Sequence, residues 1–130
     1  MIRTISIPYY TSSMDLHVEE KNLKTVITAK TEDYVPEKSP KELIEDALEH
    51  PIGTPKLSEL AKGKNKVVLV TNDHTRAVPS RLTLPILLKE IRKGNPDADI
   101  IILIATGLHR ETTEEEQRRM FGDDIVDHEK

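Results

Sequence analysis

The sequence predicts an α/β fold: a Rossmann-like, partly parallel sheet flanked by helices, with an N-terminal antiparallel β-hairpin or meander. Two continuously apolar runs, 66–71 and 99–105, are typical of strands that are buried on both faces of a parallel sheet, and a helical pattern between them completes a βαβ unit. Polar and apolar residues alternate in 1–34, as in strands with one exposed face. We therefore expect 1–34 to pack as a hairpin or meander against the α/β part, 35–130, in one domain.

The composition excludes several classes of protein. Nineteen Lys and Arg against 23 Asp and Glu give a net charge of −4, with no basic stretch that would indicate a nucleic-acid or anionic-membrane partner. There is no cysteine, which excludes disulfide scaffolds, zinc fingers and thiol nucleophiles. The longest strongly apolar run, 100–105, is far shorter than the roughly 20 residues that span a bilayer. The N-terminus has no export signal, so we expect a cytoplasmic protein without a membrane partner.

Three segments of the N-terminal part have strand character. Ile5 and Ile7 flank Ser6, residues 15–19 alternate polar and apolar side chains, and 23–29 carry Val, Ile and Thr after a polar turn. With all three segments as strands this part is a meander, and with two it is a hairpin.

Capping and turn residues predict where the helices begin and end. Ser39-Pro40 followed by Glu42 matches a capping box with proline at the first helical position, so a helix is expected to begin there and to end at Pro51. A shorter helix is expected over 54–63.

Two further helices follow the apolar runs. The helix between the runs contains Pro85, which leaves two starts open: near Thr83, or near Ser80 with a bend at the proline. The last helix is expected to begin near Thr112, because Thr112 and Glu115 match a second capping box.

The polar residues that could bind a ligand or take part in a reaction follow the two apolar runs. Ligands of open α/β sheets bind beyond the carboxyl ends of the strands. This rule selects the segments 72–76 and 106–110. If the two strands are neighbours, the two loops face one another.

The first loop contains Asp73, Thr75 and Arg76. The planar guanidinium of Arg76 suits a carboxylate or a phosphate, and Asp73 could accept from ribose hydroxyls or orient the arginine. The alternative is structural: Asp73 and Thr75 cap a turn, and Arg76 pairs with a nearby acid. For His74 the simplest expectation is exposure to water.

The second loop ends in His109, after Gly107 allows a sharp turn. A histidine at the carboxyl end of a strand can transfer a proton near neutral pH. The alternative is an exposed or hydrogen-bonded loop histidine without a catalytic role. The acidic residues 114–116 already satisfy the next helix N-terminus, so an anionic ligand is expected on the Arg76 side, with His109 reaching in from its neighbour.

Two motifs at this separation resemble the nickel-pincer-nucleotide-dependent lactate racemase family. They are 73–76 (Asp-His-Thr-Arg) with 79–80 (Pro-Ser), and 105–110 (Ala-Thr-Gly-Leu-His-Arg). The similarity also includes 51–53 and 121–126, and it covers only the N-terminal part of much longer proteins. We therefore expect the chain to be an N-terminal fragment of a larger two-domain enzyme. A hydrophobic content of only 36% also suits a piece whose missing part completes the burial.

The resemblance implies that the full protein interconverts D- and L-2-hydroxy acids. In the family, a histidine removes the hydroxyl proton while the hydrogen on C2 leaves as hydride to a nickel-pincer nucleotide (pyridinium-3,5-bisthiocarboxylic acid mononucleotide nickel). By motif, His109 corresponds to a catalytic acid–base histidine and Arg76 to the arginine that binds substrate. Asp73, His74, Thr75 and Arg76 correspond to a cofactor-binding loop.

The resemblance also implies what these 130 residues lack. The second catalytic histidine, the lysine that bonds to the cofactor and the nickel-ligating histidine lie beyond Lys130 in the family. No metal ligand is therefore expected within this chain, and the fragment by itself is expected to be inactive. The implied partners are a small 2-hydroxy acid and the missing C-terminal part. The alternative is a non-enzymatic α/β module that binds a nucleotide or an acidic partner through Arg76.

Overall fold

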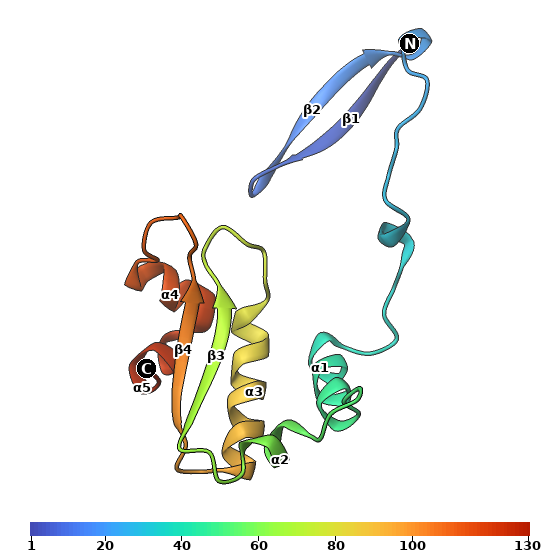
Figure 1. The fold of residues 1–130 in the computed structure, drawn as a ribbon. Coiled ribbons are helices and arrows are strands. Elements are labelled where there is room, and N and C mark those ends of the chain that lie inside the picture. The colour runs from blue at the N-terminus through green and yellow to red at the C-terminus, as the bar shows by residue number, and fades with distance from the viewer. The chain divides into compact units, whose positions relative to one another are not determined.

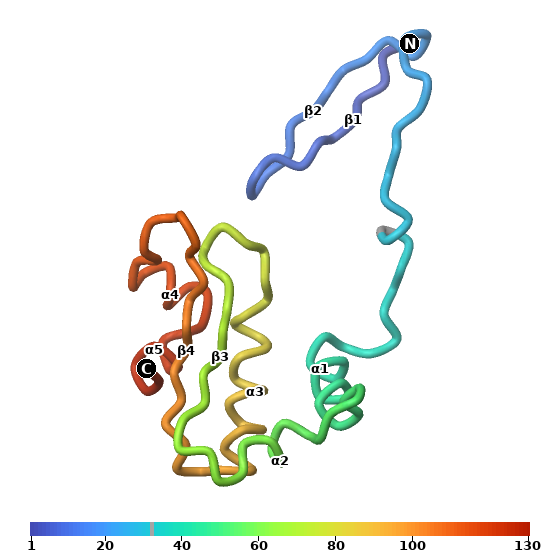
Figure 2. The backbone as a smooth tube through the Cα atoms, viewed as in Figure 1, coloured from blue at the N-terminus to red at the C-terminus, as the bar shows by residue number. Residues whose placement is uncertain are grey.

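The computed structural model describes residues 1–130, apart from the side chain of Glu32. The chain forms two units, Met1–Pro36 and Glu37–Lys130. The first contains an antiparallel pair of strands, and the second contains a parallel pair flanked by helices (Figure 1), which confirms the α/β prediction. Figure 2 traces the backbone of both units.

The first unit is a hairpin. Strands β1 (Ile2–Tyr9) and β2 (Ser12–Glu19) pair antiparallel across a two-residue turn. The prediction of a third strand at 23–29 is wrong, because within the described chain this segment pairs with no strand. It lies between two 3-10 turns, η1 (Glu20–Asn22) and η2 (Lys30–Asp33). Nearly all side chains of the hairpin are exposed, so no apolar face holds a third strand in place.

The second unit begins with helix α1 (Pro40–Glu49), where the predicted capping box is confirmed. The Ser39 N–H donates to Glu42 Oε2 at 2.8 Å, and the Glu42 N–H donates to Ser39 Oγ at 3.4 Å. The next helix, α2 (Leu57–Ala61), begins three residues later than expected and ends as predicted before Gly63.

The parallel pair consists of β3 (Lys66–Asn72) and β4 (Asp99–Ala105), in register from Lys66–Asp99 to Asn72–Ala105. Helix α3 (Ser80–Gly94) connects them. Its start at Ser80 decides between the two predicted possibilities. The Ser80 hydroxyl lies 3.3 Å from the hydroxyl of Thr71, so a hydrogen bond joins the end of β3 to the start of α3.

One face of the parallel pair is buried. The helices cover it with a core centred on Ile91, which is fully buried; the other core residues are Ala61, Leu84, Leu88, Ala98, Ile100, Phe121 and Ile125. On the other face Val70 is 68% exposed and Leu103 is 52% exposed. The expectation that these strands are buried on both faces is therefore wrong for this chain, because helices α2 and α3 and the two helices that follow β4 contribute to a single core.

The chain ends in two helices, α4 (Glu114–Phe121) and α5 (Asp123–His128), separated by Gly122 at φ 96°. The second capping box lies one residue later than predicted, on Thr113 and Glu116. Thr112 is buried, and its carbonyl accepts from the Gln117 side chain at 3.1 Å. Because its side chain points inward, Thr112 leaves the capping position to its neighbour.

Close packing of α2 on α3 gives a stability prediction at Gly94. A Cβ atom built at Gly94 lies 1.8 Å from the Ser58 carbonyl oxygen, closer than any tolerated contact. Gly94→Ala is expected to destabilise the protein by roughly 1–3 kcal/mol through overpacking. Helix propensity alone predicts the opposite, a gain of about 0.5–1 kcal/mol. Thermal unfolding distinguishes the two signs. Lys93→Ala on the same turn is the control, and an unchanged or raised midpoint for Gly94→Ala contradicts the prediction.

Candidate functional site

The two loops selected from the sequence lie at the same end of the sheet. Because β3 and β4 are parallel and in register, Asn72 and Ala105 end side by side. The loop that follows each strand leaves from this end (Figure 1). This places 73–79 and 106–113 next to each other, where ligands of open α/β sheets bind.

Asp73 joins the two loops. Its side chain is 1% exposed, and both carboxylate oxygens accept hydrogen bonds. The backbone N–H and the hydroxyl of Thr75 donate to Oδ1 at 3.1 and 2.7 Å, and His109 Nδ1 lies 2.5 Å from Oδ2. The Thr75 hydroxyl, followed by the His109 ring, lowers the pKa of Asp73 from 3.8 to about 2. Asp73 is therefore an anion that can only accept.

The bond to Asp73 decides which nitrogen of His109 is available. Since a carboxylate only accepts, Nδ1 must donate, and in the neutral ring Nε2 then holds the free lone pair. The His109 side chain is 49% exposed, so this lone pair can meet a ligand. Gly107 at φ 58° allows the turn in which the His109 N–H donates to the Thr106 carbonyl at 3.0 Å. The arrangement is that of an oriented general base.

Arg76 is exposed, and its guanidinium makes no ion pair or hydrogen bond with any side chain that the structure describes. Its backbone N–H donates to the Asp73 carbonyl at 3.3 Å. The structural alternative from the sequence therefore holds for Asp73 and Thr75, which cap a turn, and fails for Arg76, which has no acidic partner among the described residues. An exposed guanidinium in this loop suits a carboxylate or a phosphate.

His74 does not point to water as expected. Its side chain is 17% exposed, and its buried Nδ1 has no hydrogen-bond partner among the described residues, the Glu116 carboxylate lying 3.8 Å away. Arg110 donates to both oxygens of that carboxylate, at 2.7 and 2.8 Å, and holds the pKa of Glu116 far below its usual range. The pairing of Arg110 with Glu116 was not predicted from the sequence, in which Glu116 stood out only as one of the acidic residues 114–116.

A capping box and three acidic residues stand at the N-terminus of α4. Thr113 and Glu116 satisfy each other there, and Arg110 completes the arrangement. That an anionic ligand does not bind at this helix stays a prediction.

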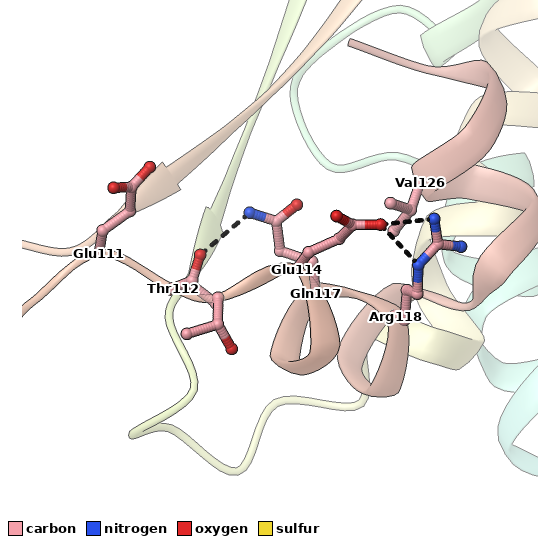
Figure 3. A pocket seen from close by; sticks show the side chains of 7 residues that line it. Glu111, Thr112, Glu114, Gln117, Arg118 and Val126 are labelled. Atoms are coloured by element: carbon pink, nitrogen blue, oxygen red, sulfur yellow. Dashed lines mark hydrogen bonds and ion pairs between the residues drawn. The ribbon is translucent and has the colours of Figure 1, made fainter.

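A separate surface hollow lies beside α4, and two of its charged residues, Glu114 and Arg118, are paired with each other (Figure 3). Glu114 accepts from Arg118, which also binds Asp123 and Asp127 at 3.3 and 2.8 Å. The Gln117 amide donates to the Thr112 carbonyl. These contacts stabilise the α4–α5 corner rather than form a binding site.

The family of the chain follows from comparison with known proteins. A family model described as the lactate racemase N-terminal domain matches residues 9–130. The chain belongs to this family. This confirms the resemblance noted in the two loop motifs.

Named relatives of the lactate racemase N-terminal domain agree with this assignment. The chain is 46% identical over 125 residues to a lactate racemase from Thermoanaerobacterium thermosaccharolyticum. The matched region is 96% of the chain and 29% of that protein. It is 41% identical over 125 residues to a lactate racemase from Lactiplantibacillus plantarum. Here the matched region is 96% of the chain and 30% of that protein. The chain therefore spans about three-tenths of the length of these relatives.

A solved structure has the same fold. The lactate racemase apoprotein from Thermoanaerobacterium thermosaccharolyticum matches 98% of the chain and 29% of its own length, with a TM-score of 0.81 and 44% identity.

No group of three or more His, Cys, Asp or Glu side chains in the described part of this lactate racemase N-terminal domain could hold a metal ion. No helix described in it has the length and apolar character needed to cross a membrane.

Proposed function

We propose that the protein containing this domain racemises or epimerises 2-hydroxy acids, with His109 as one acid–base residue. The observation that carries the proposal is the Asp73–His109 pair, which orients a half-exposed imidazole at the carboxyl end of two parallel strands. The relatives named lactate racemase make a 2-hydroxy acid the substrate class to expect.

Each residue of the site has a distinct part in the proposed reaction. The Nε2 atom of His109 accepts the hydroxyl proton of the substrate, and Asp73 stabilises the imidazolium that forms. When a proton is returned to the oxygen, the same Nε2 donates it. Arg76 binds the substrate carboxylate through its free guanidinium. Thr75 keeps Asp73 ionised and holds the loop in its turn.

The residues of this chain fit part of a nickel-pincer nucleotide. Arg76 is exposed, its guanidinium has no side-chain partner among the described residues, and it follows β3 in the same loop as Asp73, so it is a candidate contact for an anionic nucleotide group. His74 and Thr75 lie in the same loop and are further candidates for contact. Asp73 has both oxygens engaged, so we assign it to holding this loop rather than to touching the cofactor. When bound, the nucleotide supplies a carbon that accepts hydride from C2 of the substrate and returns it.

The nickel requires ligands from elsewhere. The family resemblance implies that the nickel-ligating histidine lies beyond Lys130, so the remainder of the protein is expected to supply the ligands. We accordingly propose that the domain by itself is inactive.

The test is racemisation by the full-length protein loaded with its cofactor. One enantiomer of lactate, deuterated at C2, is incubated with the protein, and both enantiomers are then analysed for label. We expect conversion to the other enantiomer with the deuterium retained, because hydride transfer does not exchange with solvent. Loss of the label to water contradicts hydride transfer and indicates a carbanion. No conversion of any 2-hydroxy acid tested favours the binding module, in which Arg76 holds a nucleotide or an acidic partner.

A further inference from the structure

The outer edge of β4 receives the last residue of the sequence. The Ile102 N–H donates to the Lys130 carbonyl at 2.7 Å, a bond of the kind that joins neighbouring strands. Glu129, between α5 and this contact, is already extended, at φ −107° and ψ 160°. The backbone thus leaves the helix and meets the strand edge within two residues.

The contacts of the last two residues give the direction of the chain. Arg92 donates to both carboxylate oxygens of Glu129, at 3.1 and 2.9 Å, and to the Ala98 carbonyl just before β4, at 2.6 Å. One residue later, the Lys130 carbonyl lies at Ile102, in the middle of β4. The chain therefore runs from the start of β4 towards its end, which is the parallel direction.

The rest of this edge is open. The N–H and C=O of one strand residue point to the same side, so the Ile102 C=O and the Ile104 N–H face outward with the Ile102 N–H. Neither forms a backbone bond outside its own strand pair anywhere in the described chain. Unpaired backbone groups along an edge are a template for another strand.

An apolar groove of about 230 Å³ runs beside this edge. Its apolar walls come from Ile102 and Ile104 of β4 and from three residues of α4 and α5, namely Phe121, Ile125 and Val126; Lys130 lies at its border. A side chain projecting from a strand on this edge would enter the groove and extend the existing core.

We propose that this edge and groove bind the segment immediately after Lys130 in the longer protein, as a third parallel strand. The bond from Ile102 to Lys130 sets the register: the first residue after Lys130 pairs with Ile102 and places an apolar side chain in the groove, and the second pairs with Leu103 on the opposite face. The crossover through α4 and α5 matches the one through α3, whose helix belongs to the same core.

The third strand extends the candidate site. A parallel strand on β4 ends at the same sheet edge as Asn72 and Ala105. The loop that follows it then lies on the β4 side of His109, where the C-terminal part of the protein can contribute residues to the site. This inference rests on the backbone contact and the groove, and it does not depend on the racemase proposal.

The test is cross-linking in the full-length protein, with cysteines outside the tested pair replaced. Leu103→Cys is combined with a cysteine at the second residue after Lys130, and the protein is treated with a short bifunctional thiol reagent. Val70→Cys, in register with Leu103 on β3, replaces Leu103→Cys in the matched control. Neighbouring strands lie about 4.8 Å apart, so the control pair is about twice as far apart, and we expect it to link on the order of tenfold more slowly or not at all.

The position of the link distinguishes the outcomes. An intramolecular link from Leu103→Cys, mapped by mass spectrometry, supports the third strand. A link of equal yield from Val70→Cys, no link from either, or a link between two molecules overturns it. As a second measurement, slow hydrogen exchange of the Ile104 N–H is expected in the full-length protein. Rapid exchange of this amide contradicts the proposal even if cross-linking fails for chemical reasons.

Discussion

Replacing His109 by alanine in the full-length protein is expected to lower racemisation by roughly 10²–10⁴-fold, the usual contribution of a positioned acid–base group. The His109 ring is half exposed, and its side-chain hydrogen bond is to Asp73. Because little packing is lost with the ring, we expect the His109→Ala protein to fold. Because the equilibrium constant between enantiomers is one, kcat/KM must fall by the same factor in both directions. The cofactor content is expected to stay unchanged, because no metal ligand is assigned to His109.

The control for this substitution is His50→Ala. His50 is exposed at the end of α1, where its Nδ1 lies 3.2 Å from the Asp46 carbonyl, and it belongs to no site. Its loss is expected to leave racemisation unchanged. Added imidazole is expected to restore part of the activity of His109→Ala, since a free base can occupy the vacated space. Full activity of His109→Ala would falsify the assignment of His109 as an acid–base residue.

Asp73→Asn is expected to lower kcat by roughly 10²–10⁴-fold with little change in KM, because the amide can donate to Nδ1 and so move the ring proton to Nε2. With a proton on Nε2, the neutral ring can no longer accept one from the substrate. Asp46→Asn is the matched control, since Asp46 also pairs with a histidine, His50, but at an exposed site. A rise in KM with unchanged kcat would indicate that Asp73 binds a ligand rather than positions His109.

The same substitution changes how stability depends on pH. The pKa of Asp73 is lowered in the folded protein from 3.8 to about 2. The carboxylate therefore contributes stability above pH 3.8, and this contribution is lost as the pH falls from 3.8 towards 2. Denaturant unfolding at several pH values is expected to show the free energies of unfolding of wild type and Asp73→Asn converging over this range. A constant difference contradicts the assignment.

Local signals in the sequence were sufficient for most element boundaries. The β4 strand has the predicted bounds because an apolar run followed by Thr-Gly leaves little choice. The capping box at Ser39 depends on residues within one turn, which any tertiary context preserves. The capping box predicted at Thr112 lies on Thr113 instead, because Thr112 is buried in the tertiary structure.

Burial was less accessible from the sequence. The runs in β3 and β4 have the composition of strands covered on both faces, yet Val70 and Leu103 are exposed here. The apolar composition of a strand shows that both of its faces could be buried. Whether a face is buried depends on whether another helix or strand packs on it. The open face and the open edge of β4 both fit a domain that spans about three-tenths of its relatives.

From the sequence alone, the α/β class, the two loops that follow the strands, and the candidates Arg76 and His109 could be determined, because hydrophobic periodicity and turn chemistry act over a few residues. The tertiary structure alone decided that Asp73 binds His109, 36 residues further along the chain. It also decided that Arg76 has no acidic partner among the described side chains. Such pairings depend on the register of the two strands and on the paths of the two loops. The spacing of two residues along the sequence determines neither the register nor the loop paths.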